Sequence, residues 1–489
     1  MLRFVPQLLD TLIRRLKFRS ELDFRKGSEE EAQFDNYRRF VRKPFANLVR
    51  ILPEQVTSVV HTMFLAQLPH LGTMPCMDAE LALHVVHCFG NGGPKWATQL
   101  GPLEPLLDAI HRSEVRGHAH HIVLLAYYEV ASRYGAFFKK YPAQLPGVLQ
   151  AMLGAGGLQH AHPTVKSRAA YLFLKLIKVV VTERALVEPM LEALVRGLAD
   201  FLGKEPAATG IAAGDRNYLY EAAGVLLSQV WLGAARRHAF LLAVVGPLLQ
   251  QVSDGLKAAT PVPGGGIPPD AVEPVGEWAS RQLAALGCVT KGFSKKVKGA
   301  VGDLFMSCMD AGVACILALP SHASTRATVR FLLHRMVSVL GTPVLPKLDL
   351  LLPALINVHM VQELGEALSF LVNAMAAFKE AMAPTIANTL LPIVKQVFAI
   401  MPGADVPPQS DLANDRRTLQ RRYFAFLKAV LDNNLSAAML TPGNAPHLFS
   451  LLDTAYQGLT TIADDGVMKA CASVFASVIA AWMPAPGVE

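Results

Sequence analysis

Two groups of basic residues have the spacing that would let them hold a phosphate backbone. In the first, Lys291, Lys295 and Lys298 stand at i, i+4 and i+7, with Lys296 beside them. A helix would place the first three on one face. Cations on one face can replace the counterions condensed on a nucleic acid, which gives affinity without reading sequence.

The second group lies further along the chain. Arg417, Arg421 and Lys428 stand at i, i+4 and i+11 and would also share a helix face, with Arg416 and Arg422 alongside. The alternative for either group is an ordinary solvated face opposite an apolar stripe, since charged runs are common on helices. The expected phosphate contacts from the two groups are Lys291, Lys295, Lys296, Lys298, Arg417, Arg421 and Arg422.

A histidine cluster, His118, His120 and His121, is the strongest candidate for metal ligands. Residues at i and i+2 point to different sides of a helix, so these side chains could not close a site without help from elsewhere. We expect a solvated helix start before Ile122 instead, and no metal or cofactor.

Catalytic signatures are missing from the sequence. It contains no G-x-S-x-G, H-E-x-x-H, Walker or G-x-G-x-x-G motif. Carboxylate pairs such as Asp464–Asp465 and Asp411/Asp415 fit helix starts, where they favour the positive end of the helix dipole. We therefore do not expect an enzyme.

The elements that must carry these residues are amphipathic helices. In the segment 35–51, Tyr37, Val41, Leu48 and Ile51 recur at intervals near 3.6, with arginines mostly between them. Pro44 falls inside this segment, where we expect it to kink or break the helix.

A second segment, 419–431, repeats the pattern with a longer apolar stripe. Its members are Leu419, Tyr423, Phe426, Leu427 and Val430. A stripe of this kind needs a neighbouring helix to cover it.

Helices of this type recur along the chain, so we expect an all-α fold, a single α-solenoid of HEAT-like antiparallel helix pairs over residues 1–489. Residues 257–275, rich in Pro and Gly, are expected to form a flexible loop between helices. A phosphate-binding loop is the alternative, but no Lys-Ser or Lys-Thr follows the glycines.

The composition is compatible with a large apolar core and with a negatively charged binding partner. The chain has 489 residues, 52% hydrophobic content and a formal net charge of +7, compatible with nucleic acid without requiring it. The six cysteines form no C-x-x-C pair, so we expect reduced, buried thiols. Pro484 and Pro486 interrupt the uncharged stretch 470–488, and we expect no membrane insertion.

Five segments, in this order, resemble the exportin-T family of the importin-β (karyopherin) superfamily. The likeness runs from about Phe4 to about Trp482. The segments are Val165–Phe173, Tyr220–Leu227, Thr290–Lys296, Phe331–Met336 and Arg421–Leu427. Lys166 and Arg168, in the first segment, are further candidates for phosphate contact. Arg168 could instead tie adjacent helices together.

The resemblance implies a HEAT-type superhelix that carries tRNA from nucleus to cytoplasm with Ran in its GTP form, contacts nucleoporins and shuttles through the nuclear pore. It also implies that this chain lacks the family's N-terminal third, with the main Ran contact, and stops before the family's C-terminal end. We expect a monomer. The alternative is a HEAT-repeat scaffold that binds proteins and carries no RNA.

Overall fold

The structure, a computed structural model, describes residues 4–19, 29–93, 95–260, 266–294, 296–403, 405–462 and 464–483. Over these ranges the regular structure consists of helices, with no strand. The chain divides into two compact units, Met1–Gly233 and Ala234–Glu489, and each is considered by itself.

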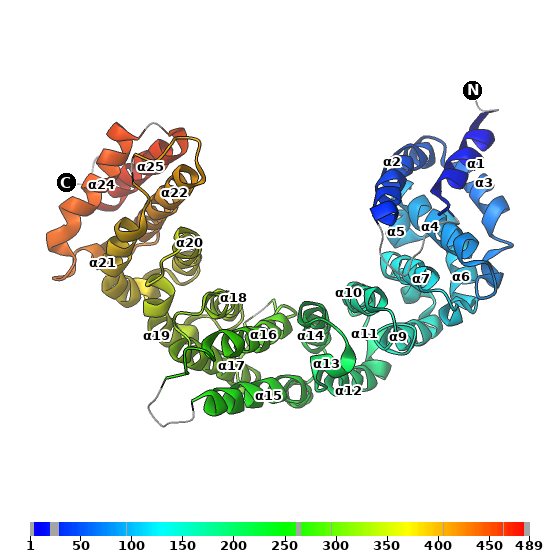
Figure 1. The fold of residues 1–489 in the computed structure, drawn as a ribbon, viewed down its shortest axis with the longest axis horizontal. Coiled ribbons are helices and arrows are strands. Elements are labelled where there is room, and N and C mark those ends of the chain that lie inside the picture. Colours follow the sequence, from blue (N-terminus) through cyan, green and yellow to red (C-terminus); the bar gives the residue numbers. More distant parts are fainter. Residues whose placement is uncertain are drawn as a thin grey trace. The chain divides into compact units, whose positions relative to one another are not determined.

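Unit 1 is built of two layers of helices (Figure 1). The layer on the concave side of this unit, called the inner layer here, contains α2 (Glu29–Ile51), α4 (Cys76–Gly92), α7 (His121–Arg133), α10 (Pro163–Val180) and α14 (Ala213–Leu227). The outer layer contains α3 (Pro53–Phe64), α6 (Glu104–Arg112), α9 (Leu145–Leu153) and α12 (Leu191–Leu202), and α1 (Val5–Leu16) packs on α2 and α3. The connections contain one-turn helices, α5 (Trp96–Gln99), α8 (Phe137–Lys140), α11 (Arg184–Val187) and α13 (Pro206–Thr209).

Unit 2 repeats this arrangement. Its inner layer contains α16 (Val272–Thr290), α18 (Ala323–Leu340), α20 (Val361–Phe378), α22 (Asp411–Asp432) and α25 (Asp465–Trp482). Its outer layer contains α15 (Ala234–Ala259), α17 (Ala300–Ala318), α19 (Leu345–Ile356), α21 (Ala383–Ile400) and α24 (Leu448–Thr461), with the short α23 (Ser436–Met439) between layers.

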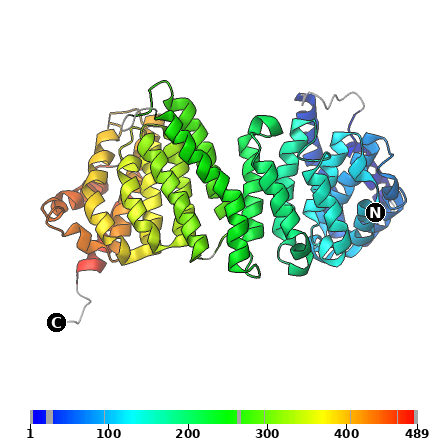
Figure 2. The same ribbon diagram turned by 90° about the horizontal axis from the view of Figure 1, so that it is seen from below.

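Within each unit the helices stand side by side along the stack (Figure 2). Each inner helix contacts the next one, as α4 contacts α7 and α20 contacts α22. A stack in which helix pairs touch their neighbours is an α-solenoid. The predicted all-α solenoid of HEAT-like pairs is therefore confirmed.

Apolar periodicity explains the individual helices. In α1, Val5, Leu9, Ile13 and Leu16 are buried on one stripe, and each buried side chain of this size contributes about 1.5–3 kcal/mol. The predicted stripe of α22 is also confirmed, because all five of its members are buried: Leu419, Tyr423, Phe426, Leu427 and Val430.

The predicted stripe in α2 is wrong, although the helix itself is present. Tyr37 and Ile51 are exposed. The buried stripe consists of Arg38, Val41, Phe45 and Val49 instead. Arg38 is buried in contact with Glu80 of α4. The buried face of α2 is therefore rotated relative to the predicted face.

Pro44 does not end α2, which continues to Ile51. The proline lies on the exposed side of the helix. Water can therefore hydrogen-bond the carbonyl group that the proline ring leaves without a donor.

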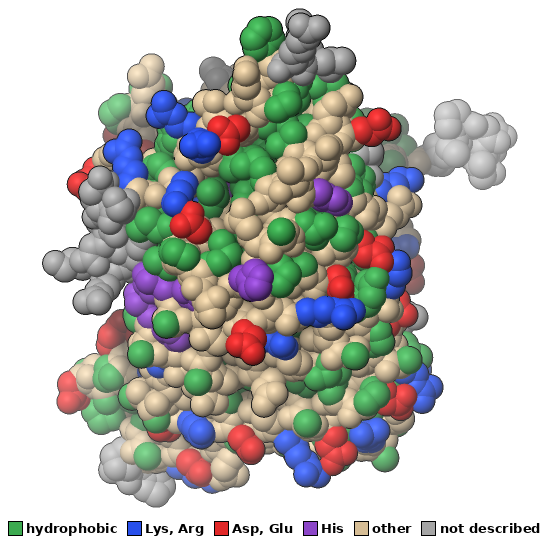
Figure 3. All heavy atoms as spheres, turned by 90° about the vertical axis from the view of Figure 1, so that its right-hand side faces the viewer, with side chains coloured by type: hydrophobic (Ala, Val, Ile, Leu, Met, Phe, Trp, Pro, Cys, Tyr) green, Lys and Arg blue, Asp and Glu red, His purple; other side chains and the backbone are tan. Residues whose placement is uncertain are grey.

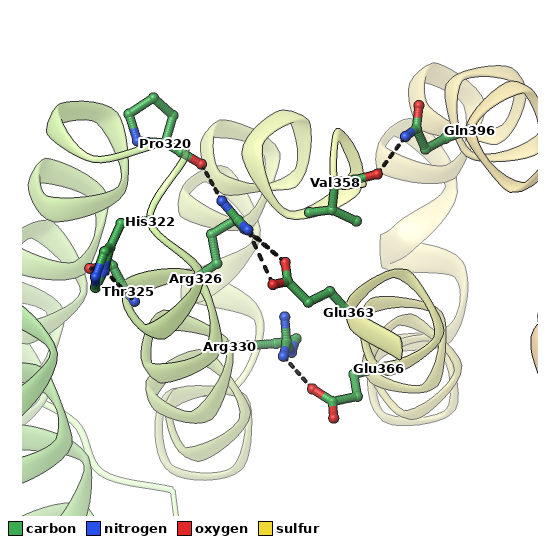
Figure 4. Close-up of polar contacts among 9 residues, drawn as sticks. All are labelled: Pro320, His322, Thr325, Arg326, Arg330, Val358, Glu363, Glu366 and Gln396. Atoms are coloured by element: carbon green, nitrogen blue, oxygen red, sulfur yellow. Dashed lines mark hydrogen bonds and ion pairs between the residues drawn. The ribbon is translucent and has the colours of Figure 1, made fainter. Parts of the chain in front are cut away.

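Ion pairs join consecutive inner helices. Arg38 donates to both carboxylate oxygens of Glu80, 42 residues later, at 3.0 and 2.7 Å, and its Nε donates to the Leu16 carbonyl at 2.7 Å. In unit 2 the same geometry joins Arg326 of α18 to Glu363 of α20, at 2.9 and 3.1 Å (Figure 4). Each pair spans one repeat of the solenoid.

The region predicted as a Pro/Gly-rich loop, 257–275, is helical at both ends. Helix α15 continues to Ala259, and α16 begins at Val272. Residues 261–265 lie outside the described part of the chain, so the predicted flexibility stays a prediction.

All six cysteines are free, and five of them are buried. Burial raises the pKa of Cys88 to about 11 and that of Cys308 to about 12. These thiols stay protonated at neutral pH, in line with the prediction of small buried side chains rather than disulfides.

Four stretches are long and apolar enough to cross a membrane by length and composition alone, namely Ala234–Ala259, Ala300–Ala318, Val361–Ile400 and Asp465–Trp482. All four belong to unit 2 and pack on neighbouring helices of that stack. Between 22% and 50% of each of these windows is buried inside the structure.

Replacing Glu80 by Ala tests how much the inter-helix ion pair stabilises α2 and α4. The change leaves the Arg38 guanidinium, which is 2% exposed, buried without a carboxylate. We expect the free energy of local opening of α2 and α4 to fall by about 3–5 kcal/mol, measured by native-state hydrogen exchange. Asp10→Ala, which breaks the exposed pair with Arg14, is the control. Equally small effects of both changes would contradict this interpretation.

Candidate nucleic-acid interface

The described residues 291–294 and 296–298 are not helical, so the prediction that a helix face gathers the lysine side chains of this segment is wrong. Helix α16 ends at Thr290, and α17 begins at Ala300. The Arg335 guanidinium, from α18, donates to the carbonyl groups of Thr290 and Phe293 at 2.9 and 3.2 Å. This side chain satisfies carbonyl groups at the helix end and stops the helix there.

The segment after Thr290 is tied to α18. The Val297 N–H donates to the Val339 carbonyl at 2.8 Å. Gly299 then adopts a φ of +62°, a conformation that glycine reaches without strain. This turn gives α17 its starting direction.

The lysines of this segment have different surroundings. Lys291 Nζ lies 5.5 Å from the centre of the Phe331 ring, and the Lys296 side chain lies against Gly341. Lys298 is exposed. Lys295 lies outside the described residues, and the role of all four in phosphate binding stays a prediction.

The second predicted group does lie on a helix, α22, but its arginines diverge. Arg417 donates to the Pro408 carbonyl at 3.0 Å and lies 3.8 Å from Asp464 Oδ2. Arg421 is exposed and lies against Gly466 of α25, whereas Arg422 packs over Gly365 of α20. Arg417 and Arg421 therefore lie on the side of α22 that faces the start of α25, and Arg422 lies on the side that faces α20.

The remaining members of this helix have internal partners. Arg416 donates to the Pro402 carbonyl at 2.7 Å, and Lys428 pairs with Asp432. Neither side chain is free to serve a ligand alone.

Both predicted residues of α10 are tied to other elements. Lys166 Nζ donates to the Thr209 carbonyl at 2.8 Å. Arg168 Nε donates to Glu129 of α7 at 2.7 Å. Arg168 is nevertheless exposed, so it both links two inner helices and faces solvent.

The pKa of His87 reveals a group of cations that the sequence reading missed. Burial is the main cause that lowers this pKa to about 4, and the positive charges of Arg133, Arg42, Lys175 and Arg168 lower it further. These four residues, from α2, α7 and α10, are called the unit 1 basic cluster here.

Three members of the unit 1 basic cluster have no carboxylate partner among the described residues. Arg42 Nε donates to His84 at 3.1 Å, Arg133 donates to the Asn91 side chain, and Lys175 Nζ lies 5.3 Å from the Tyr171 ring centre. None of the three therefore forms an ion pair with the described residues, although burial raises the pKa of the Glu80 carboxyl and the charge of Arg42 acts to lower it.

A cleft of about 610 Å³ lies beside this cluster, between α2, α4, α7 and α10. Arg39, Arg42 and Arg168 line it together with several histidines and four carboxylates. The carboxylates are Glu31, Asp35, Glu80 and Glu129. Arg39 is exposed and forms no hydrogen bond with the described residues. The cleft therefore mixes cations and carboxylates, and Arg39 and Arg42 are its lining arginines without a carboxylate partner among the described residues.

Histidines of this region serve the fold. His118 Nδ1 accepts from the His120 N–H at 3.0 Å, and His120 Nδ1 accepts from the Ile122 N–H at 3.3 Å as the N-cap of α7. The predicted helix start before Ile122 is confirmed, although His118 itself is buried. The His121 and His162 rings stack at 4.3 Å.

The predicted positions at helix starts hold for Asp464, Asp465 and Asp411, whereas Asp415 lies beyond the first turn of α22. Asp464 caps α25 by accepting from the Val467 N–H at 2.9 Å, and Asp465 lies in the first turn. Asp411 is the first residue of α22.

One sequence signal could have found the unit 1 basic cluster. Residues of consecutive inner helices meet when they are about one repeat apart, as Arg42 and His84 do across 42 residues. Cations that recur at this period, such as Arg133 and Lys175, therefore align across the layer.

The side of unit 1 seen in Figure 3 carries intermixed basic and acidic side chains.

Comparison with protein families gives one match over nearly the whole chain. The family model described as Exportin-T matches residues 2–487. Relatives described as Exportin-T are 24% identical over 495 residues in Danio rerio, 24% over 496 residues in Homo sapiens and 24% over 482 residues in Arabidopsis thaliana. The alignments cover 95–98% of this chain and 48–50% of those proteins. The chain thus spans about half the length of these relatives.

Solved structures show the same fold. A structure titled "Importin13 cytosolic state" superposes with a TM-score of 0.65 at 13% identity, covering 98% of this chain and 57% of that one. Yeast importin-beta (Kap95p) gives a TM-score of 0.61 at 16% identity, covering 98% of this chain and 51% of that one. These neighbours are karyopherin solenoids.

The lowered pKa of His87 predicts a pH dependence of stability. Above about pH 6.5 the histidine is neutral in both folded and unfolded states and contributes no slope. Between pH 6.5 and about 4 the unfolded state binds the proton more readily, so the free energy of unfolding falls with falling pH. His87→Gln should remove about 1.4 kcal/mol per pH unit from that fall, measured by urea denaturation across this range. Identical slopes in variant and parent below pH 6.5 would overturn the assignment.

Proposed function

Because the chain belongs to the Exportin-T family, we propose that it is a tRNA-binding transport receptor that moves tRNA from nucleus to cytoplasm. Ran in its GTP form is the second partner, and nucleoporins are the contacts during shuttling through the nuclear pore. In this role the chain is a carrier, not an enzyme, and it acts as a monomer. The observation that carries the proposal is the family match over residues 2–487.

The unit 1 basic cluster is the proposed centre of cargo contact. Its members come from three inner helices and each lowers the pKa of His87, so the cluster extends across helices and is not a single-helix stripe. Folded RNA presents phosphates and 2′-hydroxyls along A-form helices, and proteins read it mainly through shape and backbone contacts. A curved layer with unpaired cations suits that kind of ligand.

Cations outside the cluster take secondary parts in the proposal. Lys298 and Arg421 are exposed, although Arg421 Nε also donates to the Arg417 carbonyl at 3.3 Å. The remaining candidates already hold protein groups and would share their charge with RNA, namely Lys166, Lys291, Lys296, Arg417 and Arg422. Their individual loss should matter less than loss of a cluster member.

A double variant, Arg133→Ala with Lys175→Ala, tests the proposal. Neither residue has a carboxylate partner in the described chain, so their removal leaves no buried acid unpaired. We expect weaker tRNA binding and a slope of log affinity against log salt that is smaller by about two, because each lost phosphate contact reduces it by about one. Fluorescence anisotropy of labelled tRNA across a salt series measures both.

The matched control removes two positive charges from the outer layer, Arg112→Ala with Arg196→Ala. Both residues are exposed and belong to pairs within their own helices. An equal effect of the two double variants would show that net charge alone drives binding, which contradicts the cluster as interface. Absence of tRNA binding by the parent at low salt would favour the protein-binding HEAT scaffold.

A further inference from the structure

Three residues of unit 2 converge at the ends of two consecutive inner helices. Glu273 and Glu277 lie one turn apart at the start of α16, and His322 is the N-cap of α18. His322 Nε2 lies 3.5 Å from a Glu273 oxygen and 3.9 Å from a Glu277 oxygen. The three ligand atoms all lie within 4.8 Å of one another.

From this geometry we propose that Glu273, Glu277 and His322 form a binding site for a divalent transition-metal ion of the zinc type. The proposal does not depend on the RNA cargo. Imidazole nitrogen favours zinc-type ions, and carboxylate oxygens complete such sites. Three protein ligands leave the fourth position of a tetrahedral zinc site to water.

The histidine is built into the structure, whereas the carboxylates are free to adjust. The His322 side chain is 4% exposed, and the Glu273 and Glu277 side chains are 80% and 47% exposed. Its Nε2 points at the carboxylates and forms no hydrogen bond with the described residues. Ligand atoms of a tetrahedral zinc site are about 3.4 Å apart, given metal–ligand distances of about 2.0–2.2 Å. Small rotations of the two exposed glutamates would reach that spacing.

Gly276 makes room for the ring. It lies between the two glutamates on α16, and a Cβ at this position would come within 2.4 Å of His322 Cγ and Nδ1. Only a residue without a side chain lets the imidazole lie flat on α16 with Nε2 turned to both acids. The cradle thus fixes the ring relative to the carboxylates.

A second group orients the other ring nitrogen. His322 Nδ1 lies 2.9 Å from Thr325 Oγ1, and Thr325 Oγ1 lies 3.3 Å from the Gly276 carbonyl (Figure 4 shows His322 with Thr325). A metal-binding histidine usually donates its second N–H to such an acceptor. With metal on Nε2, the proton moves to Nδ1 and is donated to Thr325 Oγ1, which in turn donates to Gly276.

Metal binding at this site would break one hydrogen bond that caps α18. In the absence of metal, Nδ1 accepts from the Thr325 N–H at 3.2 Å as the cap of α18. A protonated Nδ1 gives up that capping bond, so a bound ion replaces one helix-end contact by a link between α16 and α18. The site was invisible to motif reading, since its ligands come from two separate helices.

Zinc titration of the full chain, stripped of metal by a chelator, tests the proposal by calorimetry. We expect one site whose affinity falls at least tenfold in His322→Asn and in Glu277→Gln. Asparagine is itself a favoured N-cap, so the first variant keeps α18 capped. His70→Asn, at an exposed histidine outside the site, is the control and should bind zinc like the parent.

Two further measurements make the result specific. Thr325→Val should weaken zinc binding about 10–100-fold, and Thr325→Ser, which keeps the hydroxyl, should restore it. Co²⁺ in place of zinc should give a visible spectrum of a four- or five-coordinate ion, lost in His322→Asn. Unchanged zinc affinity in His322→Asn, or equal competition by Mg²⁺, would overturn the proposal.

Discussion

The buried contact between Arg38 and Glu80 shows the constraint on which the stack depends. A guanidinium that is 2% exposed opposite a carboxylate that is 6% exposed can persist only when the two helices hold a fixed rotation and height. Burial raises the pKa of the Glu80 carboxyl, and the arginine acts in the opposite direction. A solenoid has no distant contacts to correct a slipped helix. Pairs that span one repeat therefore set the register of neighbouring helices in each unit.

The same pairing decides which charges remain for a ligand. Arg326 and Arg330 form ion pairs with Glu363 and Glu366 of the next inner helix (Figure 4), as Arg38 does with Glu80. The formal excess of +7 thus says little about where an anion can bind. What matters is that Arg133 and Lys175 have no carboxylate partner among the described residues, and this property arises from the packing of consecutive helices.

Sequence periodicity predicted what depends on neighbours along the chain. The stripe of α22 followed from Leu419, Tyr423 and Phe426, because one helix face buried against one layer has a 3.6-residue period. The caps at Asp464 and the helix start before Ile122 followed from local chemistry. None of these features needs a partner from another repeat.

The failures have the opposite origin. The predicted apolar stripe of α2 left out Arg38, whose buried partner Glu80 lies 42 residues away, where a local pattern has no information. The lysines after Thr290 have helical spacing, but Arg335 of another helix satisfies the carbonyl groups at that point and ends α16. Residue spacing predicts which side chains share a face only where the segment is helical. Tertiary contacts decide where the helix ends.

Nearest-neighbour packing also bears on how much of the proposed RNA-binding surface depends on this part of the stack. The members of the unit 1 basic cluster come from α2, α7 and α10, and α4 lies between the first two in the inner layer. In a stack whose repeats touch only their neighbours, the positions of these side chains depend on four adjacent helices and little else. A chain that spans about half the length of its relatives can therefore keep this surface intact. Affinity for a whole folded RNA is a different quantity, because contacts spread along a solenoid add through effective concentration once the first is made. In the proposed function, the local cluster would therefore set the salt dependence per contact, and the number of repeats would set how many contacts act together.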